Sequence, residues 1–268
     1  HPMMTKTTLS DGTQLFCLRK PEAKMLDHHV DGYLQNGISI KDNAVVFDVG
    51  ANIGVFGIRA VQKAKNVKAY CFEPIPDIFS VLKKNAEEYG EGKIQVFQLG
   101  VSDAPSKAMF TYFPNTPALS TLHPEEWEKD PKSFSRAVKG TMKNPPSGMK
   151  WMKLIPSVFS GVIAYFLVKG KQQVECNLDT LSAIIEKENI EKIDLLKIDC
   201  EGAEWSVLKG VSEEHWPLIK SIVVEVHDID HRLEKIKKML YEKGFTTLHH
   251  ETEAGLEDSG MFNLFALR

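Results

Sequence analysis

Short apolar runs alternate with amphipathic segments along much of the chain. Ala44–Val49, Lys68–Glu73 and Ile94–Leu99 are compact runs rich in branched and aromatic residues, which is typical of buried parallel strands. Between them, Ile53–Ala64 and Phe79–Tyr89 carry apolar residues at helical spacing. Strands and helices that alternate in this way predict right-handed crossovers and a twisted α/β sheet covered by helices on both faces.

The same alternation returns in the last third of the chain. Two further strands and two helices are predicted there, namely Ile193–Ile198, Ile222–Val226, Ala203–Gly210 and Arg232–Lys243. Thr246–His249 and Met261–Ala266 are expected to pair as the terminal strands. Because ligands of such sheets bind beyond the carboxyl ends of the strands, the candidate site residues are sought there.

Residues 104–174 interrupt the alternation. The stretch is too long for an ordinary connection, so we expect it to have structure of its own. The Asn-Pro-Pro-Ser-Gly run at 144–148 predicts a break, and the apolar segment Leu154–Val168 falls short of the ~20 residues that span a bilayer. We therefore predict a helical lid over the ligand-binding edge of the sheet.

The chain is expected to form one main domain with additions. We predict an N-terminal extension over residues 1–40 and a main domain over residues 41–268 that contains the insertion. His1-Pro2 ahead of Met3 is expected to be an expression scar. The first residues lack the basic and apolar stretches of a signal peptide.

Composition places the chain among ordinary globular proteins. Of its 268 residues, 43% are hydrophobic and 26% are charged, which excludes a mostly disordered chain. With 33 Lys and Arg against 36 Asp and Glu, the net charge is −3, so neither nucleic acid nor an anionic membrane is the expected partner. The four cysteines are scattered without a CxxC pair, which favours a reducing, cytoplasmic setting.

Two features at strand ends are candidates for binding a nucleoside. The Asp48–Gly54 turn joins the first strand to the first helix, and its glycines allow a ligand to approach the backbone closely. Asn52 replaces the middle glycine of the dinucleotide fingerprint, which disfavours a nicotinamide dehydrogenase. Glu73 ends the second strand about 20 residues later, where a carboxylate accepts both ribose hydroxyls. A plain tight turn and a solvated carboxylate are the alternatives.

Several longer motifs resemble a known family. Phe47–Gly54 reads FDVGANIG, Phe72–Pro74 reads FEP, and Leu195–Glu204 reads LLKIDCEGAE, and all three are similar to motifs of the FkbM-type S-adenosylmethionine-dependent methyltransferases. The resemblance runs from about residue 10 to the end. Three further segments resemble the O-methylating domains embedded in, or associated with, polyketide and nonribosomal peptide synthases: Tyr112–Asn115, Asn177–Leu181 and Val223–Asp228. The chain shows no carrier or condensing segment of its own, which leaves open whether it is excised, embedded or free-standing.

The resemblance implies a class I methyltransferase fold. This fold is a Rossmann-like seven-stranded sheet, mostly parallel with an antiparallel C-terminal strand, here with a helical lid insertion. The implied cofactor is S-adenosyl-L-methionine, which becomes S-adenosyl-L-homocysteine. The Gly50 turn then faces the methionine part, Glu73 the ribose, and Gly100–Asp103 the adenine edge. The cofactor-binding positions are Asp48, Gly50, Asn52, Gly54, Glu73, Gly100, Ser102, Asp103 and Asp199.

His227 is the candidate general base. It directly follows a buried strand, and the usual pKa of an imidazole, about 6.5, suits proton removal near neutral pH. Glu201 is the candidate partner that fixes the imidazole. Glu225 is a second candidate partner, and a further alternative is that Glu201 and Glu204 only open the following helix. No chemistry is assigned to the other histidines in polar contexts: His28, His29, His249 and His250.

A metal site is weighed and not favoured. Asp199, Glu201 and Asp228 offer carboxylate oxygens of the kind that Mg²⁺ prefers. Their spacing is not diagnostic, and a histidine base at the same edge makes a metal less necessary. Asp199 has two alternative roles, namely orienting Lys197 and binding the amino group of the cofactor.

The lid is expected to select the acceptor. It offers apolar surface for an apolar chain at Pro114–Leu122, Trp127, Trp151 and Val158–Phe166. Its basic residues predict a docking surface for an acidic acyl carrier protein: Lys132, Arg136, Lys139, Lys143, Lys150 and Lys153. A core-packed helix with solvated lysines is an equal alternative.

The expected reaction is O-methylation of a hydroxyl or enol of a carrier-bound polyketide or peptide–polyketide intermediate. The alternatives are methylation of a free small molecule such as a sugar or an amine, a nicotinamide-dependent dehydrogenase, and a non-catalytic domain that keeps the fold. The acceptor atom and the oligomeric state stay open.

Overall fold

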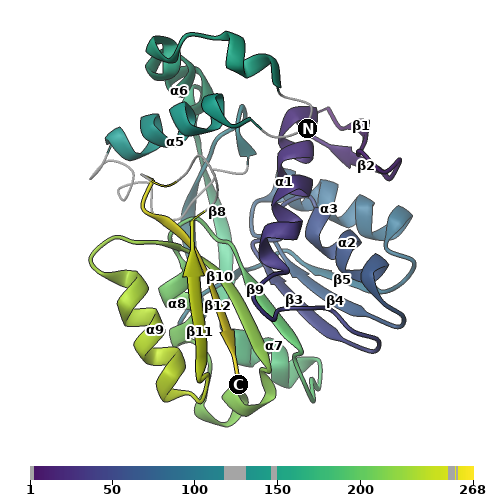
Figure 1. The fold of residues 1–268 in the computed structure, drawn as a ribbon. Helices are drawn as coiled ribbons and strands as arrows, with labels where there is room; N and C mark the ends of the chain where they lie inside the picture. The colour runs from purple at the N-terminus through teal and green to yellow at the C-terminus, as the bar shows by residue number, and fades with distance from the viewer. Residues whose placement is uncertain (1–2, 118–130, 146–149, 253–256, 258) are drawn as a thin grey trace.

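A seven-stranded sheet forms the centre of the computed structural model, which describes residues 3–117, 131–145, 150–252, 257 and 259–268 (Figure 1). The strands lie in the order β11-β12-β10-β9-β3-β4-β5. All pairs from β10 to β5 are parallel, and β12 runs antiparallel to both β10 and β11. This arrangement confirms the predicted Rossmann-like sheet with its antiparallel C-terminal strand. The strands span Val45–Val49 (β3), Lys68–Phe72 (β4), Ile94–Phe97 (β5), Leu195–Ile198 (β9), Ser221–His227 (β10), Thr247–Glu251 (β11) and Met261–Leu267 (β12).

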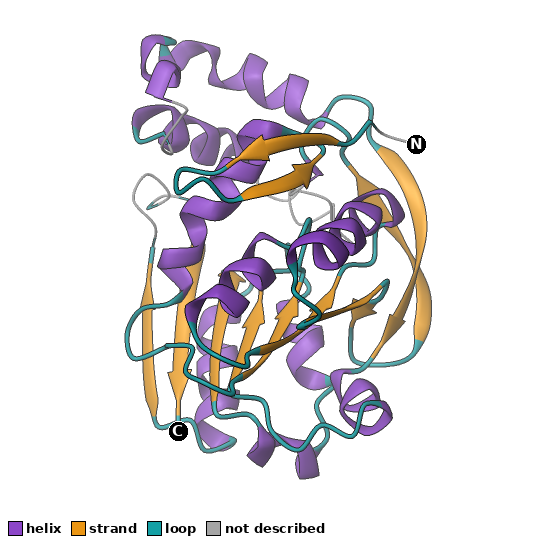
Figure 2. Cartoon of the chain, turned by 90° about the vertical axis from the view of Figure 1, so that its right-hand side faces the viewer, coloured by secondary structure: helices purple, strands orange, loops and turns teal. Residues whose placement is uncertain are grey.

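Helices cover both faces of the sheet (Figures 1 and 2). Successive strand residues point to opposite faces, so Val46 joins one apolar cluster and Phe47 the other. The first cluster includes α1, α2 and α3, and the second includes α7, α8 and α9. Because both faces are buried, the strands read as continuous apolar runs. The helices span Lys20–Tyr33 (α1), Val55–Lys63 (α2), Pro76–Tyr89 (α3), Leu181–Lys187 (α7), Glu204–Lys209 (α8) and Arg232–Glu242 (α9), and Glu213–Leu218 is a 3-10 helix (η4).

The N-terminal segment packs into the same core as the sheet. Thr5–Thr8 (β1) and Gln14–Cys17 (β2) form a hairpin that precedes α1. Asn85 of α3 is fully buried, and it ties this hairpin to the rest of the fold. Its Oδ1 accepts the backbone N–H of Phe16, and its Nδ2 donates to the carbonyls of Phe16 and Ile53. The predicted extension is therefore part of the core layer, and α1 reaches the ligand-binding edge.

The insertion contains strands as well as the predicted helices. Gly100–Val101 (β6), Gln172–Asp179 (β8) and Ser106–Tyr112 (β7) form a separate sheet in the order β6-β8-β7. The long antiparallel pair β7–β8 was not predicted, because its strands are far apart in the sequence and partly exposed. The described residues between them include the helical segments Pro131–Lys143 (α5), Lys150–Leu154 (η2), Ser157–Phe159 (η3) and Ser160–Val168 (α6).

The helical part of the insertion has an apolar cluster of its own. Val138 and Met142 of α5 pack with Met152 and with Ala164 of α6. No helix in the described part of the chain is long and apolar enough to span a bilayer.

We expect Asn85→Ala to lower the free energy of unfolding by about 2–4 kcal/mol, because it leaves buried backbone groups of the hairpin without partners. Urea unfolding monitored by circular dichroism measures this change. Gln98→Ala, at an exposed position, is the control and should change stability little. Equal stability of the two variants would contradict this role of Asn85.

Candidate functional site

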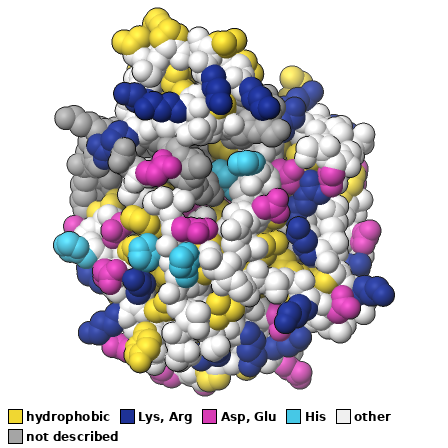
Figure 3. Space-filling model, viewed as in Figure 1, with side chains coloured by type: hydrophobic (Ala, Val, Ile, Leu, Met, Phe, Trp, Pro, Cys, Tyr) yellow, Lys and Arg dark blue, Asp and Glu magenta, His cyan; other side chains and the backbone are white. Residues whose placement is uncertain are grey.

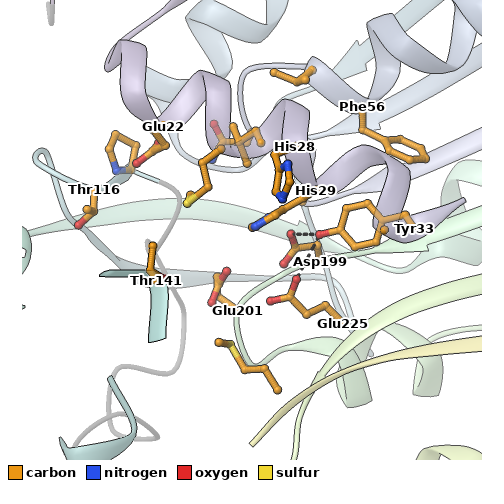
Figure 4. A pocket seen from close by; sticks show the side chains of 18 of the residues that line it. Glu22, His28, His29, Tyr33, Phe56, Thr116, Thr141, Asp199, Glu201 and Glu225 are labelled. Carbon is orange, nitrogen blue, oxygen red and sulfur yellow. Dashed lines mark hydrogen bonds between the residues drawn. The ribbon is translucent and has the colours of Figure 1, made fainter. Parts of the chain in front are cut away.

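A cavity of about 910 Å³ lies at the carboxyl ends of the central strands. Its wall includes Gly50 after β3, Glu73 after β4 and Asp199 after β9. Helix α1 and the segment α5–α6 contribute the remaining sides, and Phe262 of β12 also lines it. These three predicted strand-end positions therefore line one cavity, and Figure 4 shows Asp199 among the side chains around it.

The turn after β3 is fixed by a close backbone contact. Gly50 has a φ of +79°, and a Cβ there would lie 1.8 Å from the carbonyl oxygen of Asp199. The glycine was expected to make room for a ligand, but the space that a side chain would fill is occupied by the backbone of Asp199 at the end of β9. Asn52 also lines the cavity, with a φ of 52°. Gly54 does not line it, since it starts α2 and faces Leu82.

Glu73 is held at the cavity wall by two backbone amides. Its Oε2 accepts the N–H of Asn52 at 3.1 Å, and its Oε1 accepts the N–H of Ile75 at 3.2 Å. The side chain is buried, and burial raises the pKa of Glu73 to about 7 despite these hydrogen bonds. The carboxyl group is therefore positioned by the same turn that carries Gly50.

Asp48 lies beneath the cavity and does not line it. It pairs with Lys197 on the neighbouring strand β9, and the two charged atoms are 2.9 Å apart. Burial raises the pKa of Asp48, and the charge of Lys197 opposes that change. Burial also acts to lower the pKa of Lys197, but the carboxylates of Asp48 and Asp199 raise it overall. The structure thus gives Asp48 an internal ion pair where the sequence predicted a cofactor contact.

Acidic side chains gather beside the Gly50 turn, at the carboxyl ends of β9 and β10. Asp199, Glu201 and Glu225 all line the cavity (Figure 4). The hydroxyl of Tyr33 lies 2.8 Å from Asp199 Oδ2 and 3.1 Å from Glu225 Oε2. Asp199 Oδ1 is buried, and it has no hydrogen-bond partner within the described ranges. This wall presents carboxylate oxygens that suit a positively charged ligand.

The predicted pair His227 and Glu201 is brought together, but Glu201 lies at the cavity and His227 lies behind it. The sequence predicted the opposite arrangement, with His227 facing the acceptor. His227 Nε2 lies 3.4 Å from Glu201 Oε2 and 3.8 Å from Glu225 Oε1. This nitrogen is buried, and Glu201 lines the cavity whereas His227 does not. Glu201 has a φ of 41°. Burial, and then the charges of Asp199 and Glu225, raise the pKa of Glu201 well above its usual value.

The predicted adenine edge lies away from the cavity wall. Gly100 belongs to β6, where a Cβ would meet Leu178 at 2.4 Å. Ser102 is buried and donates its backbone N–H to Asp179. Asp103 lies 3.9 Å from the amine of Lys209. The chain leaves the central sheet after β5, so these residues join the smaller sheet and do not reach the cavity.

The trio weighed for Mg²⁺ is not assembled. Asp228 is exposed, and its Oδ1 accepts the N–H of Leu233 at the start of α9. A different trio has ligand atoms within 4.8 Å of one another, namely Glu201, Glu225 and His227. Glu204 has a structural contact in place of a metal ligand role. The backbone N–H of His227 donates to Glu204 Oε1 at 2.7 Å, so Glu204 fixes the end of β10.

Lining residues of α1 were missed, among them two histidines and a tyrosine. His28, His29 and Tyr33 line the cavity, and His29 faces the acidic wall (Figure 4). The sequence placed them in an extension and gave their histidines no chemistry. The only signal was that they recur on one side of an amphipathic helix.

The insertion contributes the apolar side of the cavity. Trp151, Met152, Ile163 and Leu167 line it together with Val138. Asn115, Thr116 and Pro117 also belong to the wall. Trp127 and residues 118–122, which were expected to contact the acceptor, lie outside the described residues.

Comparison with known proteins gives consistent matches. The family model described as a methyltransferase FkbM domain matches residues 48–247. The 31-O-demethyl-FK506 methyltransferase FkbM of Streptomyces tacrolimicus is 32% identical over 216 residues, which cover 81% of this chain and 78% of that protein. The methyltransferase sdnD of Sordaria araneosa is 30% identical over 254 residues, which cover 91% of this chain and 90% of that protein.

A solved structure supports the fold. The crystal structure of methyltransferase FkbM from Methylobacillus flagellatus KT aligns with a TM-score of 0.52 at 14% identity. The alignment covers 90% of this chain and 47% of that one, and at this identity it bears on the fold alone. The family model and the two relatives carry the assignment, and the chain belongs to the FkbM methyltransferase family.

Proposed function

We propose that this methyltransferase uses S-adenosyl-L-methionine to methylate a hydroxyl or enol oxygen of a polyketide or peptide–polyketide intermediate. The observation that carries the proposal is the cavity itself, which Glu201, backed by His227, lines together with Gly50 and Glu73. A proton acceptor and a nucleoside-binding turn are the two requirements of methyl transfer to oxygen. One relative is named for a demethylated O-31 position of FK506, which supports an oxygen acceptor.

The chain's residues fit the cofactor. Glu73 offers carboxylate oxygens to the ribose, and the turn at Gly50 and Asn52 borders the same wall. The buried, unpartnered Oδ1 of Asp199 suits the amino group. When bound, S-adenosyl-L-methionine supplies a methyl group on a positively charged sulfur. The acidic wall suits such a cation. The cofactor-binding roles predicted for four residues are not supported, because these residues do not line the cavity: Gly54, Gly100, Ser102 and Asp103.

Glu201 and His227 are proposed to act as one base. Glu201 is the member at the wall, so it meets the acceptor hydroxyl first. Its raised pKa makes it a stronger base than an ordinary carboxylate, and a cation in the cavity favours its ionised form. His227 lies 3.4 Å behind it and stabilises or receives the proton. A metal ion bound by Glu201, Glu225 and His227 is not needed for this step.

The acceptor is proposed to arrive on an acyl carrier protein. The apolar side of the cavity, which includes Met25, Leu26, Ile163 and Leu167, suits an apolar chain better than a sugar. The AMB antimetabolite synthetase AmbE of Pseudomonas aeruginosa is 28% identical over 241 residues, which cover 88% of this chain and 11% of that protein. A match to a small part of a longer synthetase agrees with the resemblance to O-methylating domains embedded in synthases, and that resemblance supports an acceptor held on a carrier.

Mass spectrometry of a hydroxylated polyketide surrogate loaded on a carrier protein, incubated with S-adenosyl-L-methionine, should show a gain of one methyl group. The same surrogate as a free thioester should gain less, because the tether raises its effective concentration. Methylation of an amine surrogate in place of the hydroxyl would contradict the oxygen acceptor. Equal methylation rates for the free thioester and the carrier-loaded surrogate would contradict the proposal that the acceptor arrives on a carrier protein.

Glu201→Gln and His227→Ala should each lower turnover by a factor of about 10²–10⁴, because each removes part of the base. The affinity for S-adenosyl-L-homocysteine, measured by calorimetry, should change only a few-fold. Glu186→Gln and His249→Ala, at positions exposed by 69% and 52%, are matched controls and should keep full turnover. Unchanged turnover in either site variant would remove that residue from the base.

The affinity of the wild-type chain for S-adenosyl-L-homocysteine should rise as the pH increases through about 7, the pKa of Glu73. Below that pH the carboxyl group is protonated, and above it the ionised form accepts hydroxyl hydrogen bonds more strongly. Glu73→Gln should bind about tenfold more weakly at high pH and lack this rise. Calorimetry across the pH series measures both. The same pH dependence in the variant would exclude Glu73 as its origin.

A further inference from the structure

The end of η2 and the outer side of η3 and α6 carry exposed apolar side chains. We call this surface the apolar tip, and its exposed residues are Leu154, Val158, Phe159, Val162, Tyr165 and Phe166. Leu154 is 85% exposed and Val158 is 79% exposed. Figure 3 shows hydrophobic side chains gathered at the end of the molecule where α6 lies in Figure 1. A helix that is apolar all round and half exposed indicates an interaction surface.

Basic side chains lie next to the tip. We call them the basic belt, and its exposed residues are Arg136, Lys139, Lys143, Lys150, Lys153 and Lys169. Residues 131–171 contain no Asp or Glu, although the whole chain has a net charge of −3. Figure 3 shows Lys and Arg side chains in a band directly below the apolar end. The segment 131–171 is therefore positively charged, whereas the chain as a whole has a negative net charge.

The inner side of α6 faces the cavity. Ser160 and Ala164 are buried, and Ile163 and Leu167 line the cavity. A single short helix thus separates the apolar tip from the apolar wall of the site. A partner bound at the tip would lie next to the route by which an apolar acceptor enters.

We infer that the apolar tip and the basic belt dock on an anionic lipid surface, with the tip in the apolar boundary and the belt at the headgroups. A planar bilayer meets the outermost apolar side chains first and the lysines behind them, which is the order that interfacial helices use. An acidic protein would need an apolar hollow to receive a protruding tip. Because α6 is too short to cross a bilayer, it lies in the interface.

This inference departs from the expectation, based on net charge, that no membrane is involved. The value of −3 averages over the whole chain and hides the absence of acidic residues from 131 to 171. The inference does not rest on the proposed methyl transfer, because binding to lipid requires neither the cofactor nor the base.

Co-sedimentation of the full chain with phosphatidylcholine vesicles, with and without phosphatidylserine, tests the inference. We expect the wild type to pellet with the phosphatidylserine vesicles at low salt and to be released at high salt. The triple variant Leu154→Asp, Val158→Asp, Tyr165→Asp should bind at least about tenfold more weakly. None of these three side chains lines the cavity, so methyl transfer to a soluble acceptor should persist and report that the variant is folded.

A second variant tests the belt separately. Lys139→Glu, Lys143→Glu, Lys153→Glu should reduce binding at least about tenfold at low salt. The matched controls replace exposed residues elsewhere: Tyr241→Asp, and the triple change Lys65→Glu, Lys83→Glu, Lys187→Glu. Both controls should bind as the wild type does.

Three outcomes would overturn the inference. The first is a wild type that stays in the supernatant with both kinds of vesicle. The second is binding that the tip and belt variants retain in full. The third is a wild type that ignores vesicles but binds a purified acyl carrier protein, or forms a dimer in light scattering that the tip variant abolishes.

Discussion

The site depends on the close packing of β3 against β9 at their carboxyl ends. A Cβ at Gly50 would lie 1.8 Å from the carbonyl oxygen of Asp199, so the turn and the acidic strand end meet through bare backbone. Just before this point, the buried pair Asp48 and Lys197 joins the same two strands. The turn proposed to bind the nucleoside and the carboxyl groups proposed to accept the proton are therefore held together where the ends of β3 and β9 meet.

Buried carboxyl groups give the cavity its chemical character. Lys197 also lines the cavity, but its charge is paired with Asp48, and the carboxyl groups of Glu73, Asp199 and Glu201 line the same cavity. Burial raises the pKa of Glu73 to about 7 and that of Glu201 well above its usual value. A cationic ligand favours the ionised forms of these groups. The groups that attract a cation are thus also the groups that become able to accept a proton when it binds.

The central sheet could be predicted because burial on both faces gives its strands continuous apolar runs. The pairing of β7 with β8 could not, since it joins distant, half-exposed segments. His29 and Tyr33 were missed because their place depends on how α1 docks, which no local pattern states. The His227–Glu201 pair followed from two adjacent strand ends, but its order did not, because the backbone conformation at Glu201 is invisible in the sequence.

A crystal structure of the chain with S-adenosyl-L-homocysteine tests the central claim most directly. The account predicts that the nucleoside lies against the Gly50 turn with its ribose at Glu73, and that the sulfur faces Glu201 across the cavity. A nucleoside bound elsewhere, or a Glu201 side chain turned away from the sulfur, would contradict it.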